Sequence, residues 1–148
     1  MKKLNNKGFS LVELIIVIAI MAILAAALAP QLMKYIEKSR VSTDKQTCDS
    51  IKSCVNTATA EDDVYKEVTA TAGTVIVEVS SSGIATGTGS SISSIPKLKA
   101  ELESSLGSGG KLTPKSSGAN KFIAKIVVDA SGNITSVTVD TDTGVMSK

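Results

Sequence analysis

An uninterrupted apolar segment near the N-terminus constrains this chain more than any other feature. Every residue from 14 to 29 is apolar, and polar side chains are few from residue 9 to residue 33. As a helix, residues 9–33 would be about 37 Å long, which is enough to cross a bilayer. The segment has no polar face, and a chain of 148 residues cannot bury such a helix on all sides. These properties count against a core helix and favour a membrane segment.

Two interpretations place the segment in a membrane. Lys2 and Lys3, followed later by the small-residue stretch 27–29, resemble an ordinary secretory signal peptide with its cleavage site. The apolar stretch is longer than the roughly 7–15 residues usual in signal peptides, however, and Pro30 would follow the cut. A retained helix with its N-terminus in the cytoplasm agrees better with the lysines that precede it, because basic residues favour the cytoplasmic side.

Glu13 lies inside the apolar segment, and membrane insertion does not explain its presence. A charged side chain at the centre of a span costs roughly 2.5–3.5 kcal/mol on insertion scales, and the cost is smaller near the end, where Glu13 lies. The surrounding aliphatic side chains offset that cost. Because an ionisable residue within a span is by default functional, we expect Glu13 to have a partner.

The residues around Glu13 carry a resemblance to a known family. Residues 7–13 read KGFSLVE, so that a short basic leader ends in a Gly directly before a Phe, and an acid stands at the fifth position after the Gly. This pattern, followed by the long aliphatic run, resembles the leader and helix start of type IV prepilins. Pro30 also stands where many pilins carry a helix-distorting proline. Beyond the apolar segment the resemblance is one of architecture only.

The resemblance implies that a membrane-embedded prepilin peptidase cuts between Gly8 and Phe9. It also implies N-methylation of the new Phe9 amine and assembly of many subunits into a helical filament. We expect Glu13 to pair with the Phe9 amine of a neighbouring subunit and to set the axial register. Pairing within one subunit is the competing possibility, because the two positions are i and i+4. Pro30 either kinks the helix or is a tolerated membrane proline.

The helix is expected to continue beyond the apolar segment, as far as residue 59. Apolar side chains recur there at steps of three, four and seven, which predicts an amphipathic half that docks on a sheet. We therefore divide the chain into a leader peptide (1–8), a hydrophobic transmembrane and filament-core helix (9–33), the amphipathic half of the spine helix (34–60) and a globular head (61–148). The apolar face of the amphipathic half comprises Val41, Cys48, Ile51, Cys54, Val55 and Ala58.

In the head, residues 74–79, 122–129 and 134–140 have strand patterns, and the last two are predicted to form a β-hairpin. A short helix is predicted from about Pro96 to Leu106. Two Ser/Gly-rich stretches, 80–94 and 107–121, are predicted to be exposed connectors. The expected fold class is α+β, with a long N-terminal spine helix packed on a small antiparallel β-sheet, which is the pilin fold that the resemblance implies.

The composition gives little support to an enzyme. The sequence has no His, and no Ser or Cys has a recognisable base partner, so we predict no catalytic residue, no cofactor and no metal site. Asp140 and Asp142 alternate as in some calcium loops, but a surface turn is the favoured interpretation.

Cys48 and Cys54 would lie about 9 Å apart along one helix, which favours two free, buried thiols over a disulfide. Nearly balanced charges argue against specific nucleic-acid binding.

The sequence therefore predicts a structural subunit of a type IV pilus, a class associated with cell adhesion and motility. We expect a single-pass protein of the cell membrane before assembly and an extracellular filament afterwards, with the prepilin peptidase, the pilus assembly machinery and further copies of the chain as partners. A pseudopilin of a type II secretion or DNA-uptake system is the first alternative. The second is a monomeric membrane-anchored extracellular binding domain, which predicts no processing at Gly8 and no need for Glu13.

Overall fold

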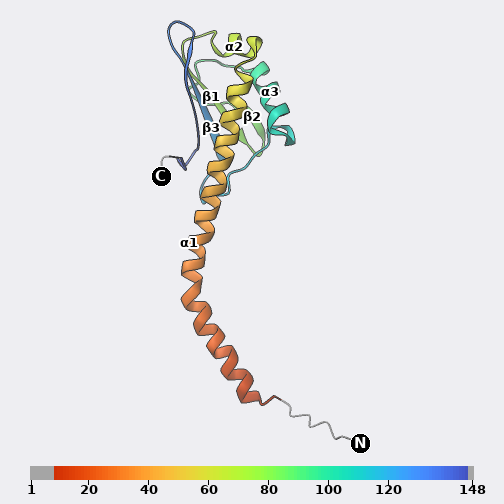
Figure 1. The fold of residues 1–148 in the computed structure, drawn as a ribbon, viewed down its shortest axis with the longest axis vertical. Helices are drawn as coiled ribbons and strands as arrows, with labels where there is room; N and C mark the ends of the chain where they lie inside the picture. Colours follow the sequence, from red (N-terminus) through yellow and green to blue (C-terminus); the bar gives the residue numbers. More distant parts are fainter. Residues whose placement is uncertain (1–8, 147–148) are drawn as a thin grey trace, which may run out of the picture. The chain divides into compact units, whose positions relative to one another are not determined.

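The computed structural model describes residues 9–146, which belong to two compact units. The first unit ends at Lys38, and the second comprises Ser39–Lys148. Helix α1 (Leu11–Ala58) contributes residues to both units. The other elements follow in the order α2 (Asp62–Val68), β1 (Gly73–Ser80), β2 (Gly83–Thr86), α3 (Pro96–Leu106), the 3-10 turn η1 (Ser108–Gly110), β3 (Lys121–Val128) and β4 (Ile134–Thr141) (Figure 1).

The described part of the first unit is almost entirely helix. Its large apolar side chains, from Phe9 to Ile36, are all exposed. Pro30 lies inside α1, and the helix continues through it. By length and composition α1 is able to cross a membrane, and none of its most apolar window is buried. This unit therefore presents an apolar surface that needs lipid or protein to cover it.

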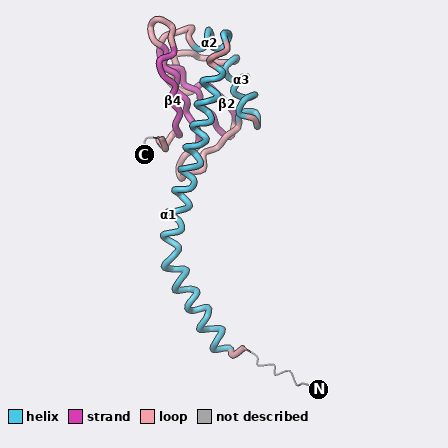
Figure 2. Tube along the Cα trace, in the orientation of Figure 1, coloured by secondary structure: helices cyan, strands magenta, loops and turns pink. Residues whose placement is uncertain are grey.

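The second unit contains a four-stranded antiparallel sheet with the strand order β2-β1-β3-β4 (Figure 2). The central strands β1 and β3 pair along their whole length, from Gly73 opposite Val128 to Ser80 opposite Lys121. β3 and β4 form the predicted hairpin. In its turn, hydrogen bonds from the backbone N–H groups of Asn133 and Ser131 lower the pKa of the exposed Asp129 carboxyl.

The core lies between one face of this sheet and the helices. Alternate residues of β1 and β3 are buried, as expected when one face of a strand points into the core. The end of α1, the buried valines of α2 and the middle of α3 complete the core, and Phe122 on β3 is the largest fully buried side chain. Prominent core residues are Cys48, Ile51, Val55 and Ala58 of α1, Val75, Val77 and Val79 of β1, Ala124 and Ile126 of β3, and Leu98 and Leu102 of α3.

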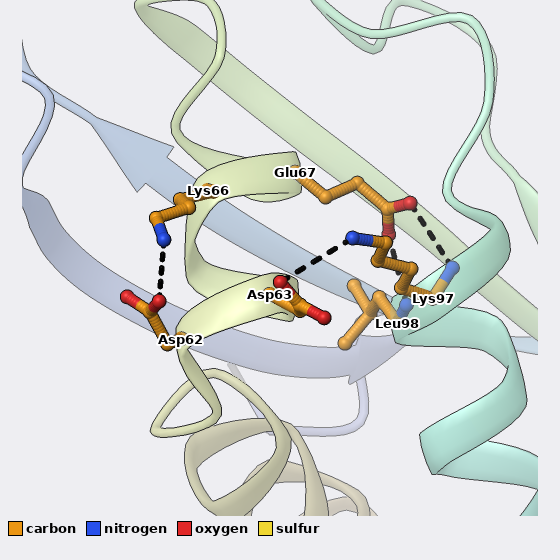
Figure 3. Close-up of polar contacts among 6 residues, drawn as sticks. All are labelled: Asp62, Asp63, Lys66, Glu67, Lys97 and Leu98. Carbon is orange, nitrogen blue, oxygen red and sulfur yellow. Dashed lines mark hydrogen bonds and ion pairs between the residues drawn. The ribbon is translucent and has the colours of Figure 1, made fainter.

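The start of α3 is capped by a side chain from α2. Pro96 opens α3, and the preceding Ile95 makes no side-chain cap. The Glu67 carboxylate instead accepts hydrogen bonds from the backbone N–H groups of Lys97 (3.0 Å) and Leu98 (2.8 Å) (Figure 3). The Lys97 ammonium also lies 3.6 Å from a carboxylate oxygen of Asp63. Helix α2 thereby supplies the anion that a helix N-terminus favours.

The structure confirms the α+β class, the three predicted strands, the hairpin and the short helix. α1 begins at Leu11 rather than at residue 9 and ends at Ala58. Three elements were missed: α2, for which no helix was predicted, and β2 and η1, which lie inside stretches predicted to be connectors. β2 has only four residues, and its pairing with β1 stabilises it despite its weak local signal.

Gly110 is expected to tolerate no side chain. Its φ is +70°, and a Cβ there would lie 2.5 Å from Cδ1 of the buried Ile84. Gly109 has a similar φ of +62°, but a Cβ there would meet nothing within 4 Å. We expect Gly110→Ala to lower the free energy of unfolding by about 3 kcal/mol, because backbone strain and overpacking add.

The matched control is Gly109→Ala, which lies in the left-handed helical region and should cost only the strain, about 1 kcal/mol. Thermal unfolding of the detergent-solubilised full chain, followed by circular dichroism, measures both variants. Equal losses of stability in the two variants would contradict the predicted close contact between residue 110 and Ile84.

Candidate processing and assembly site

The first turn of α1 is closed by hydrogen bonds to the side chains of Ser10 and Glu13. The backbone N–H of Ser10 donates to Oε2 of Glu13 (2.9 Å), and the backbone N–H of Val12 donates to Oγ of Ser10 (3.3 Å). The backbone N–H of Leu14 also donates to the carbonyl oxygen of Ser10 (3.3 Å). This is a variant of the capping box, in which a Ser at the N-cap and a Glu three residues later satisfy backbone donors at the helix start; here the Ser10 hydroxyl accepts from Val12, the second helical residue, rather than from the third.

The sequence contains the signal for this arrangement, because residues 10–13 read Ser-x-x-Glu directly before an apolar run. Sequence reasoning missed it by considering Glu13 only as an intramembrane acid. The carboxylate therefore has a local hydrogen-bond partner in the single chain. Oε2 accepts this hydrogen bond, and among the described residues none donates one to Oε1.

The predicted cleavage position lies at the edge of the described chain. Phe9 precedes the helix and is 85% exposed, whereas Gly8 and the rest of the predicted leader lie outside the described residues. Glu13 is in the first helical turn, close in sequence to Phe9. The pairing of Glu13 with the Phe9 amine of a neighbouring subunit, and a kink at Pro30, stay predictions.

A second carboxylate with a defined role, Asp44, was not singled out from the sequence. It lies on the buried face of α1 and is only 1% exposed. The backbone N–H of Lys115 donates to both carboxylate oxygens (2.8 and 3.0 Å), and that of Ser116 donates to Oδ2 (2.7 Å). Asp44 thus fixes the long connector before β3 to the helix, and its role is structural.

Both cysteines are free thiols, as predicted. Cys48 is buried, but Cys54 is only half-buried, so the expectation of two buried thiols is wrong for Cys54. Burial, together with the negative charges of Asp140, Asp44 and Asp49, raises the pKa of the Cys48 thiol to about 12. The thiolate is the nucleophilic form, so Cys48 is an inert core residue at neutral pH.

The alternating acids at the end of β4, Asp140 and Asp142, hold the C-terminal segment in place. Asp140 accepts hydrogen bonds from the backbone N–H groups of Thr141 (2.7 Å) and Met146 (2.8 Å), and Asp142 accepts one from that of Asn120 (3.0 Å). Within residues 9–146, no cluster of three or more His, Cys, Asp or Glu side chains has a geometry that could hold a metal ion. These contacts are those of a structural turn.

Comparison with known proteins supports the resemblance at the N-terminus. A family model described as the prokaryotic N-terminal methylation motif matches residues 3–29. The chain is 40% identical over 68 residues to prepilin peptidase-dependent protein A of Clostridium perfringens, covering 45% of this chain and 49% of that protein. It is 44% identical over 57 residues to the type IV major fimbrial protein FimA of Dichelobacter nodosus, covering 38% and 36%.

A fimbrial protein of Moraxella nonliquefaciens is 45% identical over 52 residues, which cover 35% of this chain and 34% of that protein. The chain thus spans between a third and a half of the length of these curated relatives. No solved structure matches it. The methylation motif, the fimbrial relatives and the α+β fold together support a type IV pilin.

Proposed function

We propose that this protein is a structural subunit of a type IV pilus and not an enzyme. One observation carries the proposal: an apolar helix whose large side chains are all exposed overlaps a methylation motif over residues 11–29 and has Glu13 in its first turn. A lipid bilayer covers such a surface before assembly, and neighbouring copies cover it in a filament. Burial of this apolar area, at roughly 25 cal/mol per Å², supplies the cohesion of the filament.

Processing prepares the subunit to move from the membrane into the filament. A prepilin peptidase removes the leader 1–8 by cutting between Gly8 and Phe9, and the Phe9 amine is then methylated. The cut removes three lysines and keeps the whole apolar helix, so that the chain stays in the membrane until the assembly machinery extracts it. Before assembly the N-terminus lies in the cytoplasm and the head, residues 61–148, lies outside the cell.

The Phe9 amine is a cation in apolar surroundings, and Glu13 of a neighbouring subunit neutralises it. A buried ion pair adds little net stability, but removal of one partner costs roughly 3–5 kcal/mol. The pair therefore enforces one axial register between subunits. Pairing within a subunit is compatible with the same filament and leaves the register to the apolar contacts. Pro30 allows the core helix to bend as residues 9–33 pack against neighbours.

A Gly8→Val variant tests the role of processing. Gly8 is the last residue before the cut, and a branched side chain there should block a subsite shaped for glycine. We expect the variant to remain in the membrane with its leader attached and to form no filaments, whereas Asn5→Ala, a control in the same leader, forms them normally.

Electron microscopy of the fraction sheared from cells, with an immunoblot of the membranes, reads out both variants. A monomeric anchored domain would give no filaments from any chain. A pseudopilin would give processed protein but no long surface filaments at native expression levels.

A further inference from the structure

We propose that the Ser10–Glu13 capping box positions the Gly8–Phe9 bond for leader removal by ending the helix at Leu11. This inference rests on the proposed function, because it concerns how the peptidase gains access to its bond. Ser10 and Glu13 act as positioning residues, since neither takes part in the bond that breaks. Glu13 thus has two roles: its side chain caps the helix before cleavage, and its charge neutralises the Phe9 amine of a neighbouring subunit in the filament.

The structure places the start of α1 after Phe9, the residue that follows the predicted cleavage position. Ser10 is the N-cap, α1 begins at Leu11, and Phe9 is outside the helix and exposed. In a helix, the carbonyl of residue i accepts a hydrogen bond from the N–H of residue i+4 and is packed within the turn. A peptidase must reach the carbonyl carbon of Gly8, and a helix that includes residues 8 and 9 would obstruct that approach.

Without the box, the sequence offers an earlier start for the helix. Asn6 is the nearest good N-cap residue upstream of Ser10. In a Ser10→Ala variant, the new Ala would also favour the helical conformation at position 10. A helix capped at Asn6 would contain both Gly8 and Phe9. Gly8 weakens this extension but does not prevent it, because one glycine costs about 1 kcal/mol relative to Ala. Ser10 and Glu13 therefore determine whether the bond lies inside or outside the helix.

Substitutions separate the hydrogen bonds from the charge. Ser10→Ala removes the N-cap acceptor, whereas Ser10→Thr and Ser10→Asp keep one. Glu13→Ala removes the second half of the box, whereas Glu13→Gln keeps an acceptor oxygen and loses only the charge. Asp shares little with Ser except the ability to cap, so rescue by Asp distinguishes capping from a direct contact between Ser10 and the peptidase.

The experiment measures the initial rate of leader removal from the full-length chain in detergent by a purified prepilin peptidase. We expect Ser10→Ala and Glu13→Ala to be cut less efficiently, by up to about fivefold, which is the limit set by the ~1 kcal/mol that loss of an N-cap costs. The loss should appear in KM with kcat unchanged, because only the fraction of chains with the bond outside the helix binds productively. Ser10→Thr, Ser10→Asp and Glu13→Gln should restore KM to near the native value.

Each outcome decides a different question. A native KM for Ser10→Ala, or failure of both Thr and Asp to rescue cleavage, would overturn the positioning role and leave the proposed function intact. No cleavage of the native chain at Gly8–Phe9 would overturn the proposed function and this inference with it. Thermal unfolding of the head should be the same in all variants, because positions 10 and 13 belong to the other unit.

Discussion

Glu13→Gln should abolish filaments while the chain is still processed and inserted into the membrane. Glutamine keeps the size of the side chain and an acceptor oxygen, so the first turn of α1 stays capped. It cannot neutralise the Phe9 amine, which becomes a buried unpaired cation at each subunit contact. Loss of one partner of a buried pair costs roughly 3–5 kcal/mol, and a filament repeats that cost at every subunit. Immunoblots of sheared and membrane fractions measure the effect.

The control for this prediction is Glu37→Gln on the same helix, beyond the apolar segment. It removes the same charge at a position that we do not assign to the amine, and filaments should form. Normal filaments from Glu13→Gln would show that the charge is unnecessary for assembly. Loss of filaments from both variants would show that assembly depends on overall charge along α1 rather than on Glu13.

Asp44→Ala should lower the free energy of unfolding of the second unit by about 3 kcal/mol. The substitution leaves the buried backbone N–H of Ser116 and the partly buried backbone N–H of Lys115 without their acceptor, at about 1–3 kcal/mol for a buried unsatisfied donor. The connector between α3 and β3 should then detach from α1. Thermal unfolding of the full chain in detergent gives the stability, and hydrogen exchange of the Lys115 and Ser116 amides shows whether the connector has detached.

Asp49→Ala is the matched control, because Asp49 is an exposed acid on the same helix. We expect its effect on stability to stay within about 0.5 kcal/mol, as for most surface substitutions. Asp44→Asn should fall between the two, since an amide offers one acceptor oxygen where the carboxylate offers two. A stability loss for Asp44→Ala no larger than that for Asp49→Ala would contradict the anchoring role.

The apolar helix and the elements with one buried face could be predicted from the sequence. The spacing of Cys48, Ile51 and Val55 and the β-branched runs around Val77 and Phe122 each bury one face and therefore leave a periodic signal. The apolar run is recognised differently, by its length and by the lack of a polar face. Asp44 also carries a signal, because it stands four residues before Cys48 on the same face. An acid at an apolar position indicates a specific buried partner.

The features that could not be predicted depend on contacts distant in sequence. Glu67 caps α3 although it stands thirty-one positions before Leu98 in the sequence. No local pattern shows that a helix will receive its cap from another helix. The partner of Asp44 is a connector seventy-one positions later, at Lys115. The capping box at Ser10 is different, because its pattern is entirely local and was visible in the sequence.

The most direct test of the account is the intact mass and N-terminal sequence of the protein sheared from cells as filaments. The account predicts a chain that begins at methylated Phe9 and retains the entire apolar helix. A chain that begins at Met1 and is found only in membranes would contradict both processing and assembly. A chain that begins at Pro30 would identify residues 1–29 as an ordinary signal peptide and would contradict the roles assigned to Phe9 and Glu13.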